Sequence, residues 1–324
     1  MKILVTGGAG YIGSVCVEQL IKKGHDVIIV DDLREGHREA VLPEAKFHEG
    51  NYGDKAVLEE IFKKNMPEAV IHFAAETLVE FSMTDPARYF INNILNGLTL
   101  LEVMRKYNCV KMIFSSTAAT FGEPEYIPID EKHPQKPINA YGESKLMFEK
   151  ILDWYNKCYG LKFNVFRYFN AAGASERLGE DHDPETHLIP LVIKTALGKR
   201  KKLEIYGSDY PTKDGTCVRD YIHVVDLADA HILALDNLNK RSSAKYNLGN
   251  GEGFTNQEVV RMVEKISGKN IEFKFSGRRA GDPAKLVASS ELAKTELNWN
   301  PKYDSLESIV STAWDWHRRN PDGY

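Results

Sequence analysis

The sequence predicts an α/β fold, in which a doubly wound parallel sheet carries a smaller C-terminal α/β lobe. Through the first half of the chain, short continuous apolar runs alternate with segments of helical period, as in parallel sheets whose strands are covered on both faces. A glycine-rich turn follows the first apolar run directly. Beyond about Ala171 the strands become shorter and the pattern changes, so we expect a second, smaller unit there.

Five apolar runs predict the strands of the sheet, because a strand buried on both faces needs no polar alternation. Between these runs lie segments in which apolar residues recur at helical spacing, for example residues 15–23 and 58–64. The predicted strands cover residues 3–5, 27–30, 69–73, 112–114 and 163–166.

The second half mixes shorter strands, at residues 203–206 and 245–248, with helices at 225–238 and 256–267. Thr255 stands before the last of these helices in the position of an N-cap. We therefore divide the chain into an N-terminal domain, residues 1–170, and a smaller lobe, residues 171–324. The chain is expected to cross back from this lobe to the sheet.

The composition is that of a soluble globular protein. Of the 324 residues, 43% are hydrophobic and 27% are charged, which is enough apolar material for a sizeable core. A net charge of −4 argues against a nucleic-acid partner, and the basic run 199–202 is expected to be a solvated loop. We expect no membrane partner, because no apolar run is long enough to span a bilayer, and no signal peptide is evident.

The four cysteines are scattered without metal-ligand spacing, so we expect no metal site. They are interpreted as free thiols in a reducing compartment, which favours the cytoplasm. The cysteines are Cys16, Cys109, Cys158 and Cys217.

The glycine-rich turn has the composition of a phosphate cradle. Glycine allows a tight turn and lets the backbone approach a pyrophosphate, and the helix that follows offers N–H groups to the anion. Asp31 lies 18 residues past Gly13, at the end of the second predicted strand, where a carboxylate binds the hydroxyls of an adenosine ribose. This carboxylate would repel a 2′-phosphate, so the turn predicts a Rossmann-type domain that binds NAD. The turn residues are Gly7, Gly10, Tyr11, Ile12 and Gly13.

Tyr141 and Lys145 are four residues apart, which places a phenol and an ammonium on one face of a predicted helix. A nearby cation stabilises phenolate and lowers a tyrosine pKa that is about 10 in free tyrosine. Thr117 follows a predicted strand, where parallel strands end at a ligand crevice, and its hydroxyl can both donate and accept a proton. Packing of a β-branched residue at a strand end remains the alternative for Thr117.

These motifs together resemble the extended short-chain dehydrogenase/reductase superfamily, and within it the UDP-glucose 4-epimerase family most closely. The resemblance runs over nearly the whole chain, and its longest piece is the block 214–224. It implies a tightly held NAD and a UDP-hexose substrate, with Tyr141 as the base on the sugar 4-hydroxyl, Thr117 as the proton relay and Lys145 on the nicotinamide ribose.

The resemblance also implies further binding residues and a homodimer, which relatives form through a four-helix interface corresponding to residues 92–107 and 143–159. Arg219 and Arg279 would bind the diphosphate, because a guanidinium offers forked donors to phosphate oxygens. Tyr206 would pack on uracil, although a core tyrosine is the rival interpretation. Further cofactor residues would be Asp32, Asn51, Tyr52, Phe73, Ala74, Ala75, Asn92, Ser115 and Phe169, and further substrate residues Asn170, His187, Leu188 and Asp282.

The chain departs from the family pattern at four positions. Asn51 replaces an Asp that caps the adenine amino group, and Thr77 replaces a Lys near the diphosphate. His187 replaces an Asn, either as a substrate donor or as a helix cap. Leu286 stands where glucose-specific relatives often carry Tyr, which predicts a sugar pocket with room for an N-acetyl group at C2.

Three alternatives compete with this interpretation. A nucleotide-sugar dehydratase or decarboxylase needs a carboxylate directly after Thr117, where this chain has Ala118 and Ala119. A non-catalytic NAD-binding protein would use the fold but would not need the Thr, Tyr and Lys together. An epimerase of another nucleotide sugar, a pentose or a uronate, is the most credible alternative.

Overall fold

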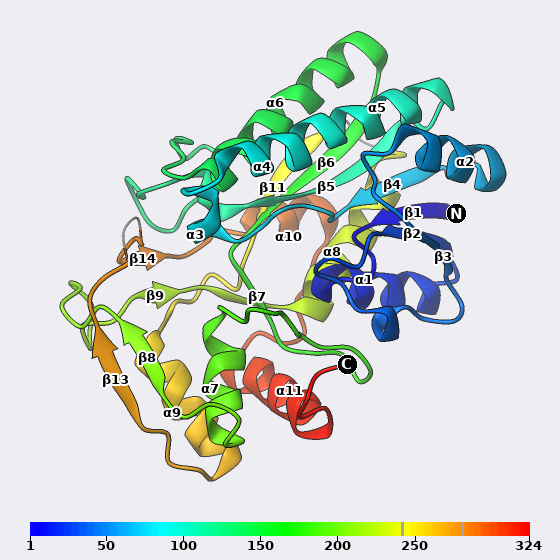
Figure 1. Cartoon of the computed structure of the whole chain (residues 1–324). Helices are drawn as coiled ribbons and strands as arrows, with labels where there is room; N and C mark the ends of the chain where they lie inside the picture. Colours follow the sequence, from blue (N-terminus) through cyan, green and yellow to red (C-terminus); the bar gives the residue numbers. More distant parts are fainter. Residues whose placement is uncertain (241–242, 280–281) are drawn as a thin grey trace.

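The computed structural model describes residues 1–240, 243–279 and 282–324. Seven parallel strands form the central sheet in the order β11-β6-β5-β4-β1-β2-β3 (Figure 1). The strands are β1 (Lys2–Thr6), β2 (Asp26–Asp31), β3 (Lys46–Glu49), β4 (Ala69–His72), β5 (Lys111–Thr117), β6 (Lys162–Tyr168) and β11 (Ala244–Leu248).

The order of the strands reverses at β1, which pairs with β2 on one side and with β4 on the other. The chain leaves β1 through the glycine turn and leaves β4 through residues 73–75, so these two segments diverge from neighbouring strand ends. In open α/β sheets a ligand crevice forms at such a switch point, beyond the carboxyl ends of the strands.

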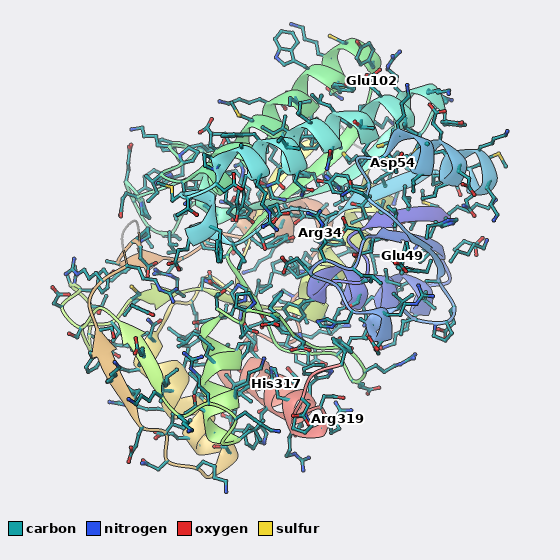
Figure 2. All side chains as sticks on the ribbon, in the orientation of Figure 1. Arg34, Glu49, Asp54, Glu102, His317 and Arg319 are labelled. Atoms are coloured by element: carbon teal, nitrogen blue, oxygen red, sulfur yellow. The ribbon has the colours of Figure 1, made fainter. Side chains whose placement is uncertain are left out.

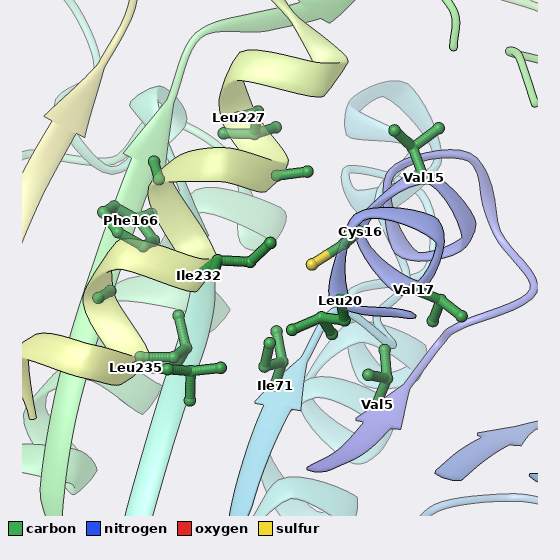
Figure 3. Close-up of a cluster of buried hydrophobic side chains, with 14 of the residues drawn as sticks. Val5, Val15, Cys16, Val17, Leu20, Ile71, Phe166, Leu227, Ile232 and Leu235 are labelled. Carbon is green, nitrogen blue, oxygen red and sulfur yellow. The ribbon is translucent and has the colours of Figure 1, made fainter. Parts of the chain in front are cut away.

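Helices cover both faces of the sheet. On one face α1 (Tyr11–Lys22) packs beside α8 (Val224–Asn237), and Figure 3 shows their apolar side chains meeting above Val5 and Ile71 of the sheet. The other face is covered by α2 (Lys55–Asn65), α5 (Asn96–Lys106) and α6 (Ala140–Tyr159). The strands contribute side chains to both cores, which explains their continuous apolar sequences.

The smaller lobe lies beyond the carboxyl ends of the sheet strands (Figure 1). Its core is formed by three helices, α7 (Leu188–Ala196), α9 (Asn256–Ser267) and α11 (Leu306–Arg319), with the paired strands β8 (Leu203–Tyr206) and β13 (Phe273–Ser276). Short strands join the lobe to the sheet: β7 (Asn170–Ala172), β9 (Val218–Arg219), β10 (Tyr221–His223), β12 (Phe254–Thr255) and β14 (Lys285–Leu286).

The remaining short elements flank the sheet and the lobe. They are α3 (Val79–Ser82), α4 (Pro86–Phe90), α10 (Glu291–Leu297), the 3-10 turns η1 (Arg38–Ala40) and η3 (Ala118–Thr120), and the π-helical segment η2 (Ile91–Leu95). None of the helices in the described part of the chain has the length and apolar composition to cross a membrane.

The predicted strands and helices of the sheet are confirmed, and Thr255 caps α9 in a capping box with Glu258. The predicted strand at 245–248 belongs to the main sheet, as β11 beside β6, so the chain does return to the sheet. β3 was not predicted, because its residues are half exposed and include Lys46, His48 and Glu49. The basic run 199–202 is an exposed loop, as expected. The division of the chain at residue 170 stays a prediction.

Candidate active site

The glycine turn brings the backbone of β1 against that of the segment after β4. Gly7 has a φ of +73°, and a Cβ there would lie 2.6 Å from the Ala74 nitrogen. A Cβ on Gly13 would lie 2.0 Å from the Gly7 oxygen. Gly10 precedes α1 without a side-chain cap, so the first N–H groups of the helix are left for an anion. Gly7, Gly10 and Gly13 therefore form a tight turn that leads into α1, with Ile12 in the first turn of the helix, and their role as a phosphate cradle stays a prediction.

Asp31 joins the end of β2 to this turn. Its carboxylate accepts one hydrogen bond from the Ala9 nitrogen and one from the Leu33 nitrogen, both of 2.9 Å. Burial raises the pKa of Asp31, and these two backbone donors oppose the rise. The carboxylate therefore shapes the turn in addition to its expected task on a ribose.

We expect the chain to bind NAD at least about tenfold more tightly than NADP, because the Asp31 carboxylate repels a 2′-phosphate. In Asp31→Asn the single amide oxygen can accept from only one of Ala9 and Leu33, and the repulsion is lost, so the preference should shrink. Titration of nucleotide-free protein with each dinucleotide measures both effects. Asp26→Asn, at the exposed opposite end of β2, is the matched control. Equal affinity of the unchanged chain for NAD and NADP would disprove the role of Asp31.

Thr117, Tyr141 and Lys145 meet where β5 ends and α6 begins. The α6 helix starts at Ala140, capped by the Asn139 side chain on the Gly142 nitrogen at 2.8 Å, which places Tyr141 in its first turn. A hydrogen bond links the hydroxyls of Thr117 and Tyr141. Lys145 is 2% exposed, and its ammonium donates to the Ser115 carbonyl at 2.8 Å and lies 6.0 Å from the centre of the Tyr141 ring.

The electrostatics of this group differ from the sequence expectation. Desolvation raises the pKa of Tyr141 to about 12, although the hydrogen bond from Thr117 opposes the rise. Desolvation also lowers the pKa of Lys145 to about 7, against the attraction of Glu149. In the protein without NAD, the charge of Lys145 is therefore not sufficient to favour the phenolate form of Tyr141. A further positive charge at this position is needed, and the oxidised nicotinamide of NAD carries one.

A buried ion pair next to Thr117, Tyr141 and Lys145 was not predicted from the sequence. Glu149, fully buried on α6, accepts from the Ser116 hydroxyl at 2.6 Å and from Arg167 of β6 at 2.6 and 3.0 Å. Ser115, on the same strand as Ser116, is hydrogen-bonded to the Tyr168 hydroxyl. These contacts hold β5, β6 and α6 in register around Thr117 and Tyr141. Glu149 was detectable in the sequence only as a charge on an otherwise apolar helix face.

A second network that sequence analysis missed is centred on Arg34, which Figure 2 labels in the middle of the molecule. Its guanidinium donates to Asp32 at 2.8 Å, to Glu76 at 2.9 Å and to the Asn92 side chain at 3.1 Å. Asn92 lies in the π-helical segment η2, a type of helix distortion that is frequent at functional sites. Arg34 thus brings together two predicted cofactor residues, Asn92 and Asp32, and Glu76 joins them.

Asn93, the neighbour of Asn92, ties this network to the catalytic helix. Its amide nitrogen donates to the Glu76 carbonyl at 3.1 Å and to the Ser144 hydroxyl at 3.0 Å, and its oxygen accepts from the Glu76 nitrogen at 2.8 Å. Ser144 lies between Tyr141 and Lys145 on α6. The pair of adjacent asparagines in a helical segment was the only signal of this link in the sequence.

Two predicted cofactor residues have their polar groups occupied by the protein. The Asn51 oxygen accepts from the Gly53 nitrogen at 2.7 Å and from Asn96 at 3.3 Å, and the Asn51 amide donates to Asp32 at 2.9 Å. The Tyr52 hydroxyl donates to the Asn92 carbonyl. Asn51 therefore orients Asp32, and its suggested bond to adenine stays a prediction.

Tyr11, Phe73, Ala74 and Ala75 surround the turn through packing. The Tyr11 hydroxyl donates to the Gly173 carbonyl at 2.7 Å, which ties the start of α1 to the chain after β7. The Phe73 and Ala74 nitrogens donate to the Thr6 carbonyl at 3.0 and 3.1 Å, and the Phe73 ring lies 4.8 Å from the ring of His231. These contacts agree with a role in lining, rather than charge recognition.

The two arginines predicted to bind a diphosphate both have protein partners. Arg219, on β9, forms an ion pair with Asp282 and donates to the Pro283 carbonyl at 2.9 Å. The Arg279 guanidinium lies 4.1 Å above the Tyr206 ring, so the structure brings these two predicted residues together. Asn170 contacts the residue that follows Arg219, because its backbone nitrogen and its side-chain amide both donate to the Asp220 carbonyl at 3.1 Å.

His187 immediately precedes α7, but its side chain makes no capping hydrogen bond, so the helix-cap alternative is wrong. Its Nδ1 instead lies 2.8 Å from a Glu180 carboxylate oxygen. Leu188 begins α7 and packs on the core of the lobe. Leu286 and Phe169 pack together on a small cluster of Ala118, Phe121 and Ile129, directly after Thr117. The structure thus places Leu286 next to the catalytic group.

The switch-point sheet, the glycine turn with Asp31, and the group of Thr117, Tyr141 and Lys145 define an NAD-binding protein of the extended short-chain dehydrogenase/reductase class. Residues 3–249 match the NAD dependent epimerase/dehydratase family, and the chain belongs to this family.

Similarity to known members extends over the full length. The chain is 51% identical to the UDP-glucose 4-epimerase of Lacticaseibacillus casei, over 100% of this chain and 99% of the relative. It is 39% identical to the UDP-glucose 4-epimerase of Bifidobacterium longum solved in complex with NAD+ and UDP, with a TM-score of 0.96 and complete coverage of both chains. It is 41% identical to the UDP-Glc/GlcNAc 4-epimerase of Campylobacter jejuni, with a TM-score of 0.86 over 98% of this chain and 99% of that one.

Proposed function

We propose that this protein interconverts UDP-glucose and UDP-galactose by NAD-dependent epimerisation at C4, through a transient 4-keto sugar, and so serves galactose metabolism. The observation that carries the proposal is the direct contact of Thr117 with Tyr141 at the carboxyl end of β5, followed by Ala118 and Ala119. This arrangement supplies a proton relay at one sugar carbon and no carboxylate for elimination. Full-length similarity to UDP-glucose 4-epimerases supports the same assignment.

NAD, when bound, supplies a reversible hydride acceptor for C4 and is regenerated in each turnover. The glycine turn and Asp31 would hold its pyrophosphate and adenosine ribose, and Lys145 its nicotinamide ribose. Tyr141 would accept the proton of the sugar 4-hydroxyl, and Thr117 would pass that proton and polarise the C4 oxygen. Proton transfer by a positioned side chain of this kind contributes about 10²–10⁴-fold to a rate.

Arg219 and Arg279 would bind the diphosphate of the substrate after leaving their present partners. Arg219 has an 11% exposed side chain and is held by Asp282, so binding would exchange a carboxylate for phosphate oxygens. Arg279 would leave the face of Tyr206, which frees that ring for the uracil. Asn170 would complete the site near the sugar. Each arginine thus already has a protein partner, a carboxylate for Arg219 and an aromatic face for Arg279, that a UDP moiety can replace.

We also propose a homodimer formed by η2, α5 and α6 of two copies. Large apolar side chains are exposed along these elements, which is unusual for a surface that stays in water. They are Ile91, Leu95, Met147 and Trp154. A cytoplasmic location is supported by the four free cysteines.

The proposed function is tested with purified protein that is examined for bound NAD and then offered UDP-galactose. Formation of UDP-glucose without added oxidant or reductant is the expected result. Offering UDP-xylose and UDP-glucuronate in parallel distinguishes the alternative epimerases of pentoses and uronates. Turnover of one of those sugars alone, or release of a dehydrated product, would contradict the proposal.

Leu286 leads us to expect turnover of UDP-N-acetylglucosamine in addition to UDP-glucose. Leu is smaller than Tyr, and its position beside Phe169 and Ala118 leaves its side chain close to the catalytic group. Leu286→Tyr should lower kcat/KM for the N-acetyl sugar at least about tenfold, because a bulky side chain in a packed pocket costs about 1–3 kcal/mol, while UDP-glucose is affected less. Lys285→Ala, the exposed neighbour on the same strand, is the control. Absence of N-acetyl turnover in the unchanged chain would remove this prediction.

A further inference from the structure

The loop between β7 and α7 gathers two carboxylates and two imidazoles outside the catalytic group. They are Glu180, His182, Glu185 and His187. One potential ligand atom from each of these four side chains lies within 4.8 Å of the other three. No role in the proposed reaction requires such a cluster.

Three of the four distances between these atoms are close to those around one small cation, and the fourth, between His187 and Glu180, is a shorter ion-pair contact. His187 Nδ1 lies 2.8 Å from Glu180 Oε1 and 3.4 Å from Glu185 Oε1. His182 Nδ1 lies 3.4 Å from Glu180 Oε1 and 3.7 Å from Glu185 Oε2. Four ligands at zinc bond lengths of about 2.0–2.2 Å in a tetrahedron are about 3.3–3.6 Å apart.

The same atoms are not satisfied by hydrogen bonds. Glu180 Oε1, His182 Nδ1 and Glu185 Oε2 have no hydrogen-bond partner among the described residues. Glu180 is only 5% exposed, and an unpaired buried carboxylate oxygen is unfavourable. The other Glu185 oxygen is already occupied, since it accepts from the backbone nitrogens of Thr186 at 2.7 Å and His187 at 2.8 Å. These three atoms therefore have only ion-pair partners, which belong to the cluster itself, and they face one shared point.

We propose that Glu180, His182, Glu185 and His187 form a structural zinc site. Two imidazole nitrogens and two carboxylate oxygens suit tetrahedral Zn²⁺, whereas Ca²⁺ and Mg²⁺ prefer six or more oxygen ligands. Two carboxylates with two neutral imidazoles carry a charge of −2, which a divalent ion neutralises. The His187 side chain is 55% exposed, so an ion can enter from solvent.

Such an ion would tie the start of α7 to the glycine turn. His182 packs edge-on against Tyr11, the first residue of α1, with ring centres 6.2 Å apart. His187 immediately precedes α7 of the substrate lobe. The site would therefore stiffen the connection between the part that holds NAD and the part that holds the sugar nucleotide. The scattered cysteines predict no metal site, and the four candidate ligands instead follow the spacing Glu-x-His-x-x-Glu-x-His.

Protonation of both histidines, in place of metal binding, would also neutralise the two negative charges of the cluster. Burial opposes protonation of His182, but Glu180 and Glu185 outweigh it and raise its pKa to about 9. In that case both histidines would be imidazolium ions, and neither would have a free nitrogen lone pair to bind added zinc. The experiment must therefore measure the metal itself.

The test uses full-length protein purified without a metal-affinity step and analysed for metals by mass spectrometry, before and after treatment with a chelator. We expect about one tightly bound zinc per chain, a lower thermal midpoint after chelation, and recovery on adding Zn²⁺. Added Co²⁺ should give the intense visible bands of a tetrahedral site. These measurements on the unchanged chain do not depend on any variant folding.

A substitution within the cluster tests whether the bound zinc lies there. His182→Gln, a partly exposed position, should weaken zinc binding at least about 100-fold, because even the outer partners of metal ligands contribute 10–100-fold. His37→Gln is the matched control, since this histidine contacts the same loop through Asp181, at 3.0 Å from its carbonyl, without joining the cluster. A chain that binds no zinc, or one that binds zinc equally well in His182→Gln, would overturn the proposal.

Discussion

Tyr141→Phe should lower kcat by on the order of 10²–10⁴-fold, because the variant has no group that can take the proton of the sugar 4-hydroxyl. NAD should remain bound, since the glycine turn and Asp31 do not contact the Tyr141 hydroxyl. The measurement is the initial rate with UDP-galactose, together with the amount of NAD that copurifies. Retention of the nucleotide with loss of turnover separates a catalytic role from a general effect on the site.

Tyr89→Phe is the control for this experiment. The Tyr89 ring packs edge-on against Tyr141, with centres 6.5 Å apart, but its hydroxyl donates to the Leu78 carbonyl. Its loss should leave kcat within a few fold of the unchanged enzyme. If Tyr141→Phe kept full activity, the assignment of Tyr141 as the base would be wrong.

Glu149→Gln should destabilise the fold by about 3–5 kcal/mol, the usual consequence of removing one partner from a buried ion pair. Arg167 is 3% exposed and would keep its charge with no carboxylate beside it, and Lys245, 3.9 Å from Glu149, would lose the same partner. Denaturant unfolding monitored by fluorescence measures the change. Activity should fall as well, because Glu149 also raises the pKa of Lys145 and holds Ser116 of β5.

Asp153→Asn provides the comparison one turn further along α6. Asp153 pairs with Lys245 at 2.8 Å, but its side chain is 52% exposed, so its removal should cost at most about 1 kcal/mol. Replacing Glu149 and Arg167 together by apolar residues of similar size should recover part of the stability, since no charge is left alone. Equal losses in Glu149→Gln and Asp153→Asn would show that burial of the pair does not matter.

The predicted sheet was recovered from the sequence because its signals are local. A strand covered on both faces is continuously apolar, and the turn after β1 requires glycines wherever backbone meets backbone. β3 has neither property and was missed. The strand at 245–248 was recognised, but its place beside β6 depends on a contact between residues far apart in the chain.

In the candidate site, too, some features were predictable from local sequence and others depend on tertiary contacts. Tyr141 and Lys145 share a helix face by their spacing alone, and Asp31 follows from its position after a strand. The environment of this pair does not follow from the sequence: desolvation, which depends on the whole fold, raises the pKa of Tyr141 against the expected direction and lowers the pKa of Lys145. The protein partners of Arg219 and Arg279 were likewise not predicted, because Asp282 and Tyr206 reach them only through tertiary contacts.

By itself, then, the sequence determined the fold class and the shared helix face of Tyr141 and Lys145, because periodicity and short spacings carry that information, and it predicted the NAD cradle. The tertiary structure alone decided which buried charges are paired, as in Glu149 with Arg167, and which side chains converge, as in Glu180, His182, Glu185 and His187. The free energy of a buried charge depends on every group that packs around it, and those groups come from distant parts of the chain.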